Sequence, residues 1–231
     1  MQAAILAGGL ATRLGELTKH QPKSMLPIMG KSFLEYQLAL LASEGITNIV
    51  LCIGHLGEQI VETIGTGKKF GVNIRYSYEA EPLGTAGALR NAEALLEDPF
   101  ISLYGDSFVS LDFNGFVSSF TSKSKLAMMS VYKNYDKYDR SNTEIRGNLV
   151  TRYSKNVRTS STIYIDYGVN IFRREALRLI PRDHFYSLED LFIRLIERQQ
   201  LMAYQVKDRF FEIGSLQGLR EFEEYMAGAV K

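Results

Sequence analysis

Short apolar runs alternate with helical periodicity through the first half of the chain. Four runs have the length and apolar content expected of strands: 3–7, 48–54, 73–79 and 100–105. Three segments between them have the periodicity of helices: 32–46, 57–65 and 85–97. This alternation predicts parallel βαβ units, in which helices cover both faces of a sheet.

The pattern changes after about residue 120, where strand-like runs lie closer together. Later elements are expected as strands at 126–133, 163–172 and 203–208 and as helices at 187–200 and 216–228. Residues 143–154 predict a hairpin around Arg146-Gly147-Asn148. Ser187 is expected to cap its helix, with Asp190 at the third helical position. We therefore predict a single domain over residues 1–231, with one sheet shared by both halves.

Composition and charge exclude several classes of protein. The 231 residues are 45% hydrophobic and 23% charged, and the net charge of +1 favours neither nucleic acid nor an anionic membrane as a partner. No apolar run approaches the roughly 20 residues of a membrane helix, and we expect no signal peptide. Cys52, the single cysteine, lies in a predicted buried strand and cannot form an internal disulfide, so we expect a cytoplasmic protein. His20, His55 and His184 lack zinc-site spacing.

The first predicted strand leads into a glycine-rich loop that is followed by two cations. Gly8 and Gly9 end the strand, and Arg13 and Lys23 come after them. Ligands bind beyond the carboxyl ends of parallel strands, and glycine lets backbone N–H groups approach an anion closely. Neither G-x-x-x-x-G-K-[ST] nor G-x-G-x-x-G is present, so a P-loop or dinucleotide site is not expected. The segment fits a polyphosphate, and a solvated glycine turn is the alternative.

This loop resembles that of the sugar-1-phosphate nucleotidyltransferases, also called NDP-sugar pyrophosphorylases. Their signature is a first strand, then Gly-Gly-x-Gly/Ala-Thr-Arg, then Pro-Lys, and this chain carries Gly8-Gly9-Leu10-Ala11-Thr12-Arg13 and Pro22-Lys23. The similarity continues along nearly the whole chain. It is greatest to the short branch that includes N-acetylmuramate 1-phosphate uridylyltransferases and heptose 1-phosphate guanylyltransferases.

The resemblance implies a fold and a separate binding role for each half of the chain. The implied fold is a Rossmann-like, mixed and mostly parallel α/β sheet of the nucleotide-diphospho-sugar transferase type. Residues 1–120 would form a nucleotide-binding half and residues 121–231 a sugar-phosphate-binding half.

A second segment, 79–89, is expected to border the nucleobase. From the residues alone, Gly84, Thr85 and Gly87 leave room for a flat ligand at a helix N-terminus, and a tight strand-to-helix loop is the alternative. The resemblance places Glu81 beside the base, where a carboxylate would accept from an N–H edge that several bases offer. It assigns the nucleotide to these residues: Leu6, Ala7, Gly8, Gly9, Thr12, Arg13, Glu81, Pro82, Gly84 and Thr85.

Two acidic residues are candidate ligands for Mg²⁺. Asp106 follows a predicted buried strand, where a lone Asp is more often a cap or turn residue. The resemblance makes it the principal metal ligand, because Gly-Asp is the family's metal-binding element. Many relatives carry a second ligand in Asp-x-Gly-Thr, where this chain has Glu212, Gly214 and Ser215. Glu212 is thus the expected second ligand, and a surface Glu before a turn is the alternative.

The resemblance also implies a sugar-phosphate site, formed by Asn142, Lys155, Asp166 and Gly168. Asp166 would accept hydrogen bonds from sugar hydroxyls. Taken without the resemblance, Asn142 is compatible with a turn residue and Lys155 with a solvated cation.

The implied activity is that of a Mg²⁺-dependent enzyme of the EC 2.7.7 class, which condenses an NTP with a sugar 1-phosphate to give an NDP-sugar and pyrophosphate. Arg13 would hold the β- and γ-phosphates, Lys23 would lie near the α-phosphate, and Asp106 would carry the metal. A cytidylyltransferase for a small phosphorylated alcohol such as phosphocholine stays open, as does a non-catalytic nucleotide-sugar sensor. The sequence does not distinguish among nucleobases, among sugars, or between monomer and homodimer.

Overall fold

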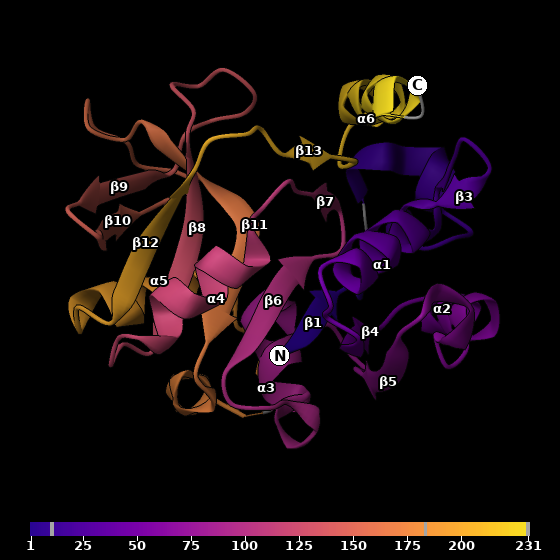
Figure 1. Cartoon of the computed structure of the whole chain (residues 1–231), viewed down its shortest axis with the longest axis horizontal. Helices are drawn as coiled ribbons and strands as arrows, with labels where there is room; N and C mark the ends of the chain where they lie inside the picture. Colours follow the sequence, from indigo (N-terminus) through magenta and orange to yellow (C-terminus); the bar gives the residue numbers. More distant parts are fainter. Residues whose placement is uncertain (10–11, 183, 230–231) are drawn as a thin grey trace.

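A nine-stranded mixed sheet runs through both halves of the chain (Figure 1). The structure, a computed structural model, describes residues 1–9, 12–182 and 184–229, without the side chains of residues 12, 13 and 229. The strands are, in spatial order, β5 (Asn73–Tyr78), β4 (Asn48–Ile53), β1 (Gln2–Leu6), β6 (Phe100–Tyr104), β11 (Tyr164–Phe172), β8 (Ala127–Lys133), β12 (Leu201–Val206), β10 (Leu149–Tyr153) and β9 (Thr143–Arg146).

Strand direction divides this sheet into two parts. β5, β4, β1 and β6 are parallel neighbours, as the alternating pattern predicted. β11 pairs antiparallel with β6 and β8, and β10 pairs antiparallel with β12 and β9, whereas β8 and β12 are parallel. The mixed α/β fold is therefore confirmed. Its parallel pairs lie mainly in the N-terminal half, where helices connect the successive strands β1, β4, β5 and β6.

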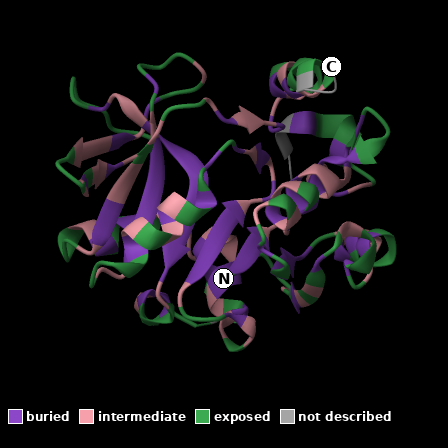
Figure 2. Cartoon of the chain, viewed as in Figure 1, coloured by how far each residue is buried: buried purple, intermediate pink, exposed green. Residues whose placement is uncertain are grey.

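Helices cover both faces of the sheet, also as predicted. The layers are α1 (Phe33–Ser43), α2 (Gly57–Ile64) and α4 (Phe113–Thr121) on one face, and α3 (Gly84–Asn91) and α5 (Leu188–Glu197) on the other. Strand β1 serves both layers, because Ala3 and Ile5 pack with the first and Ala4 with the second. The central strands are buried between the two layers (Figure 2).

The remaining elements are short, apart from the closing helix α6 (Leu216–Ala229). They are η1 (Thr12–Thr18), η2 (Lys23–Met25), β2 (Pro27–Ile28), β3 (Lys31–Ser32), η3 (Lys68–Phe70), η4 (Glu93–Leu95), β7 (Ser107–Phe108), η5 (Arg174–Leu179) and β13 (Phe211–Glu212). α6 buries Phe222 against Phe33 of α1, with ring centroids 5.1 Å apart. This contact joins the end of the chain to its N-terminal half.

Several local predictions are confirmed. β9 and β10 form the expected hairpin, and Gly147 at its turn has a φ of +61° that favours glycine. Ser187 and Asp190 form a reciprocal capping box at the start of α5. Cys52 is buried in β4, and burial raises the pKa of its thiol to about 12.

The parallel strands bring several loops to one edge of the sheet. Leu6 at the end of β1 lies opposite Cys52 of β4 and Tyr104 of β6 in parallel register. The residues that follow these strands, including Gly8 and Asp106, therefore meet beyond the same edge. None of the described helices is both long and apolar enough to cross a bilayer.

Candidate active site

A cavity of about 440 Å³ opens beyond the carboxyl ends of β1 and β6. It brings together many of the residues that the sequence singled out: Leu6, Ala7, Gly8, Gly9, Lys23, Pro82, Gly84, Thr85, Asp106 and Lys155. Lys155 follows β10 in the C-terminal half, so both halves of the chain contribute to this one cavity. Its volume falls within the roughly 300–1,000 Å³ of small-molecule sites.

An ion pair between Lys23 and Asp106 lies in the wall of the cavity. The Lys23 Nζ is 2.6 Å from Asp106 Oδ2, although the two residues are 83 positions apart in sequence. Their side chains are 16% and 29% exposed, so the pair is partly shielded and still reachable from the cavity. The site therefore holds a cation and a carboxylate in contact, where a phosphate or a metal ion can exchange partners with either one.

The turn that carries Asp106 is tightly packed. Gly105 donates its backbone N–H to the carbonyl oxygen of Leu6 over 3.0 Å. A Cβ at Gly105 would lie 2.5 Å from that same oxygen, so only glycine fits without a backbone shift. The loop after β6 is thereby fixed against the end of β1, which sets the position of Asp106.

Two of the predicted nucleotide contacts cannot be placed. Thr12 and Arg13 belong to η1, but their side chains lie outside the described part of the structure. The role assigned to Arg13 therefore stays a prediction.

Glu79 lines the cavity, whereas Glu81, which the resemblance placed beside the base, is exposed and is not among the lining residues. The Glu79 carboxylate accepts the backbone N–H of Leu83 over 3.0 Å. Burial raises the pKa of Glu79, and the hydrogen bond from Leu83 opposes that shift. Sequence inspection missed this residue, although its place directly after a parallel strand is the same signal that identified Asp106.

The first turn of α3 is held by a segment that follows η5. The backbone N–H groups of Ala86 and Gly87 both donate to the carbonyl oxygen of Tyr186 over 3.0 Å, and Tyr186 donates to Leu83 over 2.8 Å. These donors are therefore engaged within the protein, and Gly87, which was expected to leave room for a ligand, does not line this cavity. The same segment adds Phe185 and Ser187 to the cavity wall, which no sequence signal indicated.

Three of the predicted sugar contacts lie behind the cavity rather than in its wall. Asp166 Oδ2 accepts the hydroxyl of Tyr104 over 3.0 Å, Asp166 Oδ1 accepts the N–H of Gly168 over 2.9 Å, and the N–H of Asp166 donates to Asn142 Oδ1 over 3.0 Å. Asp166 is 9% exposed, and burial raises its pKa to about 6. Tyr104 lines the cavity, so its hydroxyl is the link between these residues and a ligand.

Backbone pairing between β13 and β7 brings Glu212 close to Asp106, but the Glu212 carboxylate makes its hydrogen bonds to other residues. β13 pairs with β7, and Ile213 donates its N–H to the carbonyl oxygen of Asp106 over 3.0 Å. The Glu212 carboxylate accepts hydrogen bonds from the N–H of Gly214 and from Ser215 Oγ, the latter at 2.8 Å. It does not line the cavity. As a donor set for Mg²⁺, the Asp106 oxygens at the cavity fit, and Glu212 fits if its turn gives up these contacts.

Comparison with known proteins adds independent information. Residues 2–227 match the sequence model of a family described as nucleotidyl transferase. The D-glycero-alpha-D-manno-heptose 1-phosphate guanylyltransferase of Campylobacter jejuni is 30% identical over 214 residues, which cover 93% of this chain and 95% of that protein. The mannose-1-phosphate guanyltransferase of Saccharomyces cerevisiae is 31% identical, but the match spans only 61% of its length.

A solved structure has the same fold along almost the whole chain. HddC from Yersinia pseudotuberculosis, complexed with GMP-PN, superimposes with a TM-score of 0.82 and 26% identity, covering 97% of this chain and 99% of that one. The chain also matches a UTP–glucose-1-phosphate uridylyltransferase of Synechocystis at 31% identity, of which it spans about half, 55%.

Proposed function

Because this chain belongs to the nucleotidyl transferase family, we propose that it joins a nucleoside triphosphate to a sugar 1-phosphate, giving an NDP-sugar and pyrophosphate. The observation that carries the proposal is the single cavity in which Lys23, Asp106 and Lys155 meet beside the Gly8-Gly9 loop. Two cations and a carboxylate at the carboxyl ends of parallel strands suit two phosphate-bearing substrates.

The proposed step is one displacement at phosphorus. A phosphate oxygen of the sugar 1-phosphate attacks the α-phosphorus of the nucleotide. The bond between that phosphorus and the α,β-bridging oxygen breaks, and pyrophosphate leaves with the electron pair. The attacking phosphate is already ionised, so the protein need not remove a proton. Catalysis then rests on holding two anions in line and on neutralising their charge.

The cations of the cavity have separate tasks in this proposal. Lys23, released from Asp106, would bind the α-phosphate, and Lys155 would bind the phosphate of the sugar. Arg13 would hold the β- and γ-phosphates, as the resemblance implies. Asp106 would hold Mg²⁺, with Glu212 as a second ligand. Bound Mg²⁺ supplies charge neutralisation on the phosphate oxygens.

The position of Glu79 in the cavity wall indicates which nucleobase the site would bind. Its Oε2 accepts from Leu83, and the carboxylate is part of the cavity wall, where it accepts hydrogen bonds but donates none. Guanine presents N–H groups on two adjacent atoms of one edge, which suits a carboxylate acceptor. Two curated relatives that are 30% identical and match over more than 90% of their own length are guanylyltransferases, so we propose GTP as the nucleotide.

A matrix of the common NTPs against sugar 1-phosphates, read by pyrophosphate release, tests this proposal. We expect GTP with a hexose or heptose 1-phosphate to give the highest kcat/KM. Glu79→Gln should weaken the preference for GTP, and Glu81→Gln serves as the matched control because Glu81 is exposed and outside the cavity wall. Turnover of CTP with phosphocholine would support the cytidylyltransferase instead. Nucleotide binding without pyrophosphate release in any combination would support the sensor.

A further inference from the structure

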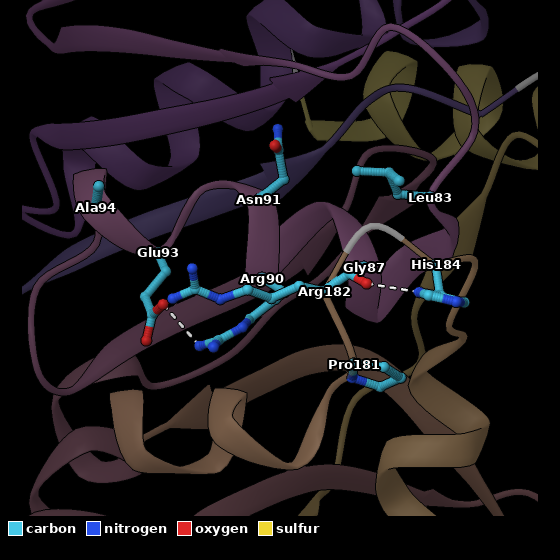
Figure 3. A pocket seen from close by; sticks show the side chains of 9 residues that line it. All are labelled: Leu83, Gly87, Arg90, Asn91, Glu93, Ala94, Pro181, Arg182 and His184. Atoms are coloured by element: carbon cyan, nitrogen blue, oxygen red, sulfur yellow. Dashed lines mark hydrogen bonds and ion pairs between the residues drawn. The ribbon is translucent and has the colours of Figure 1, made fainter.

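A second cavity, of about 250 Å³, lies against a neighbouring stripe of helix α3 (Figure 3). Gly87, Arg90 and Asn91 of α3 line it, whereas Gly84, Thr85 and Ala88 of the same helix line the candidate active site. Its other wall comes from the segment after η5, including Arg182 and His184. The two cavities share no lining residue.

The side chains around this second cavity are mainly basic. Arg90, Arg182 and His184 line it together with Glu93, the one carboxylate among its described lining residues. Figure 3 shows three side chains that point into the same space: Arg90 from α3, Glu93 from η4, and Arg182 from the segment that follows η5. Among the described lining residues, one carboxylate faces two guanidinium groups, which leaves an excess of positive charge in that set.

Arg90 is held in an unusual state for a buried cation. Its side chain is 14% exposed, and Nη1 lies 2.6 Å from Glu93 Oε2, in an ion pair that lacks hydrogen-bond geometry. The buried Nε has no hydrogen-bond partner in the described part of the chain. Arg182 is exposed, and its guanidinium makes no hydrogen bond or ion pair with another described residue. Both forks therefore have donors available for an added acceptor.

We propose that this cavity binds a small phosphate-bearing ligand and that its binding changes the affinity of the candidate active site for its nucleotide. A phosphate group matches the guanidinium fork geometrically and supplies the missing negative charge. The volume lies just below the roughly 300–1,000 Å³ of ordinary ligand pockets, which favours inorganic phosphate or a small phosphomonoester.

The route between the two cavities is short. His184 lines the second cavity, and its Nδ1 is 2.6 Å from the carbonyl oxygen of Arg182. The next residue, Phe185, lines the candidate active site, and Tyr186 accepts the hydrogen bonds that fix the first turn of α3. A ligand that draws Arg182 and His184 towards Arg90 would act on this segment. By linkage, nucleotide would change the affinity for phosphate by the same factor.

The test is titration of the full chain with inorganic phosphate and, separately, with glucose 6-phosphate, followed by calorimetry at constant ionic strength. A Lys23→Met background weakens phosphate binding at the candidate active site, where Lys155 remains, so only the signal that is lost in Arg182→Ala is assigned to the second cavity. We expect Arg182→Ala and Arg90→Gln each to weaken binding at least tenfold. Arg178→Ala is the control, because it removes the same charge from an exposed position of η5 that does not line the cavity.

The results separate the possible outcomes. Tighter binding of glucose 6-phosphate than of phosphate would identify the ligand as a phosphomonoester, and the reverse would identify the free ion. Equal affinities in Arg182→Ala, Arg178→Ala and the parent would overturn the site, and this comparison stands even if Arg90→Gln fails to fold. In the chain with Lys23 intact, we expect phosphate to shift the KM for nucleotide, and Arg182→Ala to abolish the shift. A shift that persists unchanged in Arg182→Ala would overturn the coupling.

Discussion

Replacing Gly8 by alanine tests how the glycine loop and Glu79 fit together. A Cβ at Gly8 would lie 2.2 Å from Glu79 Oε1 and 3.2 Å from the backbone nitrogen of Gly54. The Glu79 side chain is restrained, because its Oε2 accepts the backbone N–H of Leu83 over 3.0 Å. Gly8→Ala must therefore displace the Glu79 carboxylate from the cavity wall or shift the loop itself.

The size of the effect follows from these contacts. Overpacking by one methyl group typically costs about 1–3 kcal/mol, and a displaced Glu79 also loses its hydrogen bond to Leu83. In a chain of this length, a destabilisation of about 2 kcal/mol lowers Tm by roughly 4–8 °C. We expect Gly8→Ala to show that drop and to raise the KM for nucleotide.

Gly9→Ala is the matched control. A Cβ there meets no described atom within 4 Å, so Tm should stay within about 2 °C of the parent value. If phosphates lie on this loop, Gly9→Ala should still raise the KM for nucleotide. The assay is thermal melting and steady-state kinetics on both variants, and on Gly8→Ala combined with Glu79→Ala, where the added methyl should cost less. The reasoning would be refuted if Gly8→Ala melted at the same temperature as the parent. It would also be refuted if Gly8→Ala lowered Tm by the same amount in the parent and in the Glu79→Ala background.

Three further predictions concern the acidic residues. Asp106→Asn should lower kcat by at least a hundredfold, yet change the free energy of unfolding by no more than about 1 kcal/mol because the Lys23 pair is partly exposed; an active variant with unaltered Mg²⁺ dependence would place the metal elsewhere. Glu212→Gln should raise the Mg²⁺ concentration needed for half-maximal activity. Ser215→Ala removes a hydroxyl that donates to Glu212 and accepts the N–H of Gly218, so it should lower Tm without raising that Mg²⁺ concentration; a Glu212→Gln curve that matches the parent's would remove Glu212 from the metal site. Burial favours protonated Asp166 in the folded state, so the free energy of unfolding should fall as pH rises from about 4 to about 6, by up to about 3 kcal/mol, and pH-dependent melting should show that Asp166→Asn has lost this fall.

The parallel half of the fold was predictable because its apolar periodicity is local. Strands such as 48–54 and helices such as 32–46 carry their own patterns, and parallel strands place their carboxyl ends at one edge. The same rule predicts that Gly8 and Asp106 meet at that edge, and both of them line the cavity.

Contacts between distant segments were not predictable in the same way. The Lys23–Asp106 pair joins residues that are 83 positions apart. The Tyr186 carbonyl, which accepts the N–H groups of the first turn of α3, comes from the distant segment after η5. Asp166 was expected to meet a sugar, but its burial behind Tyr104 depends on how β6 and β11 pair. The resemblance indicates Glu81, which precedes Pro82, whereas the cavity is lined by Glu79 at the end of the preceding strand.

The central claim is that the α-phosphorus of a nucleoside triphosphate is transferred to a sugar 1-phosphate. Phosphorus NMR of a reaction of GTP with mannose 1-phosphate or heptose 1-phosphate tests it most directly, because each product has its own signals. The account predicts that pyrophosphate and a GDP-sugar appear in equal amounts, as GTP and the sugar 1-phosphate disappear together. Formation of GDP with a doubly phosphorylated sugar, or of orthophosphate while the sugar 1-phosphate stays intact, would contradict the account.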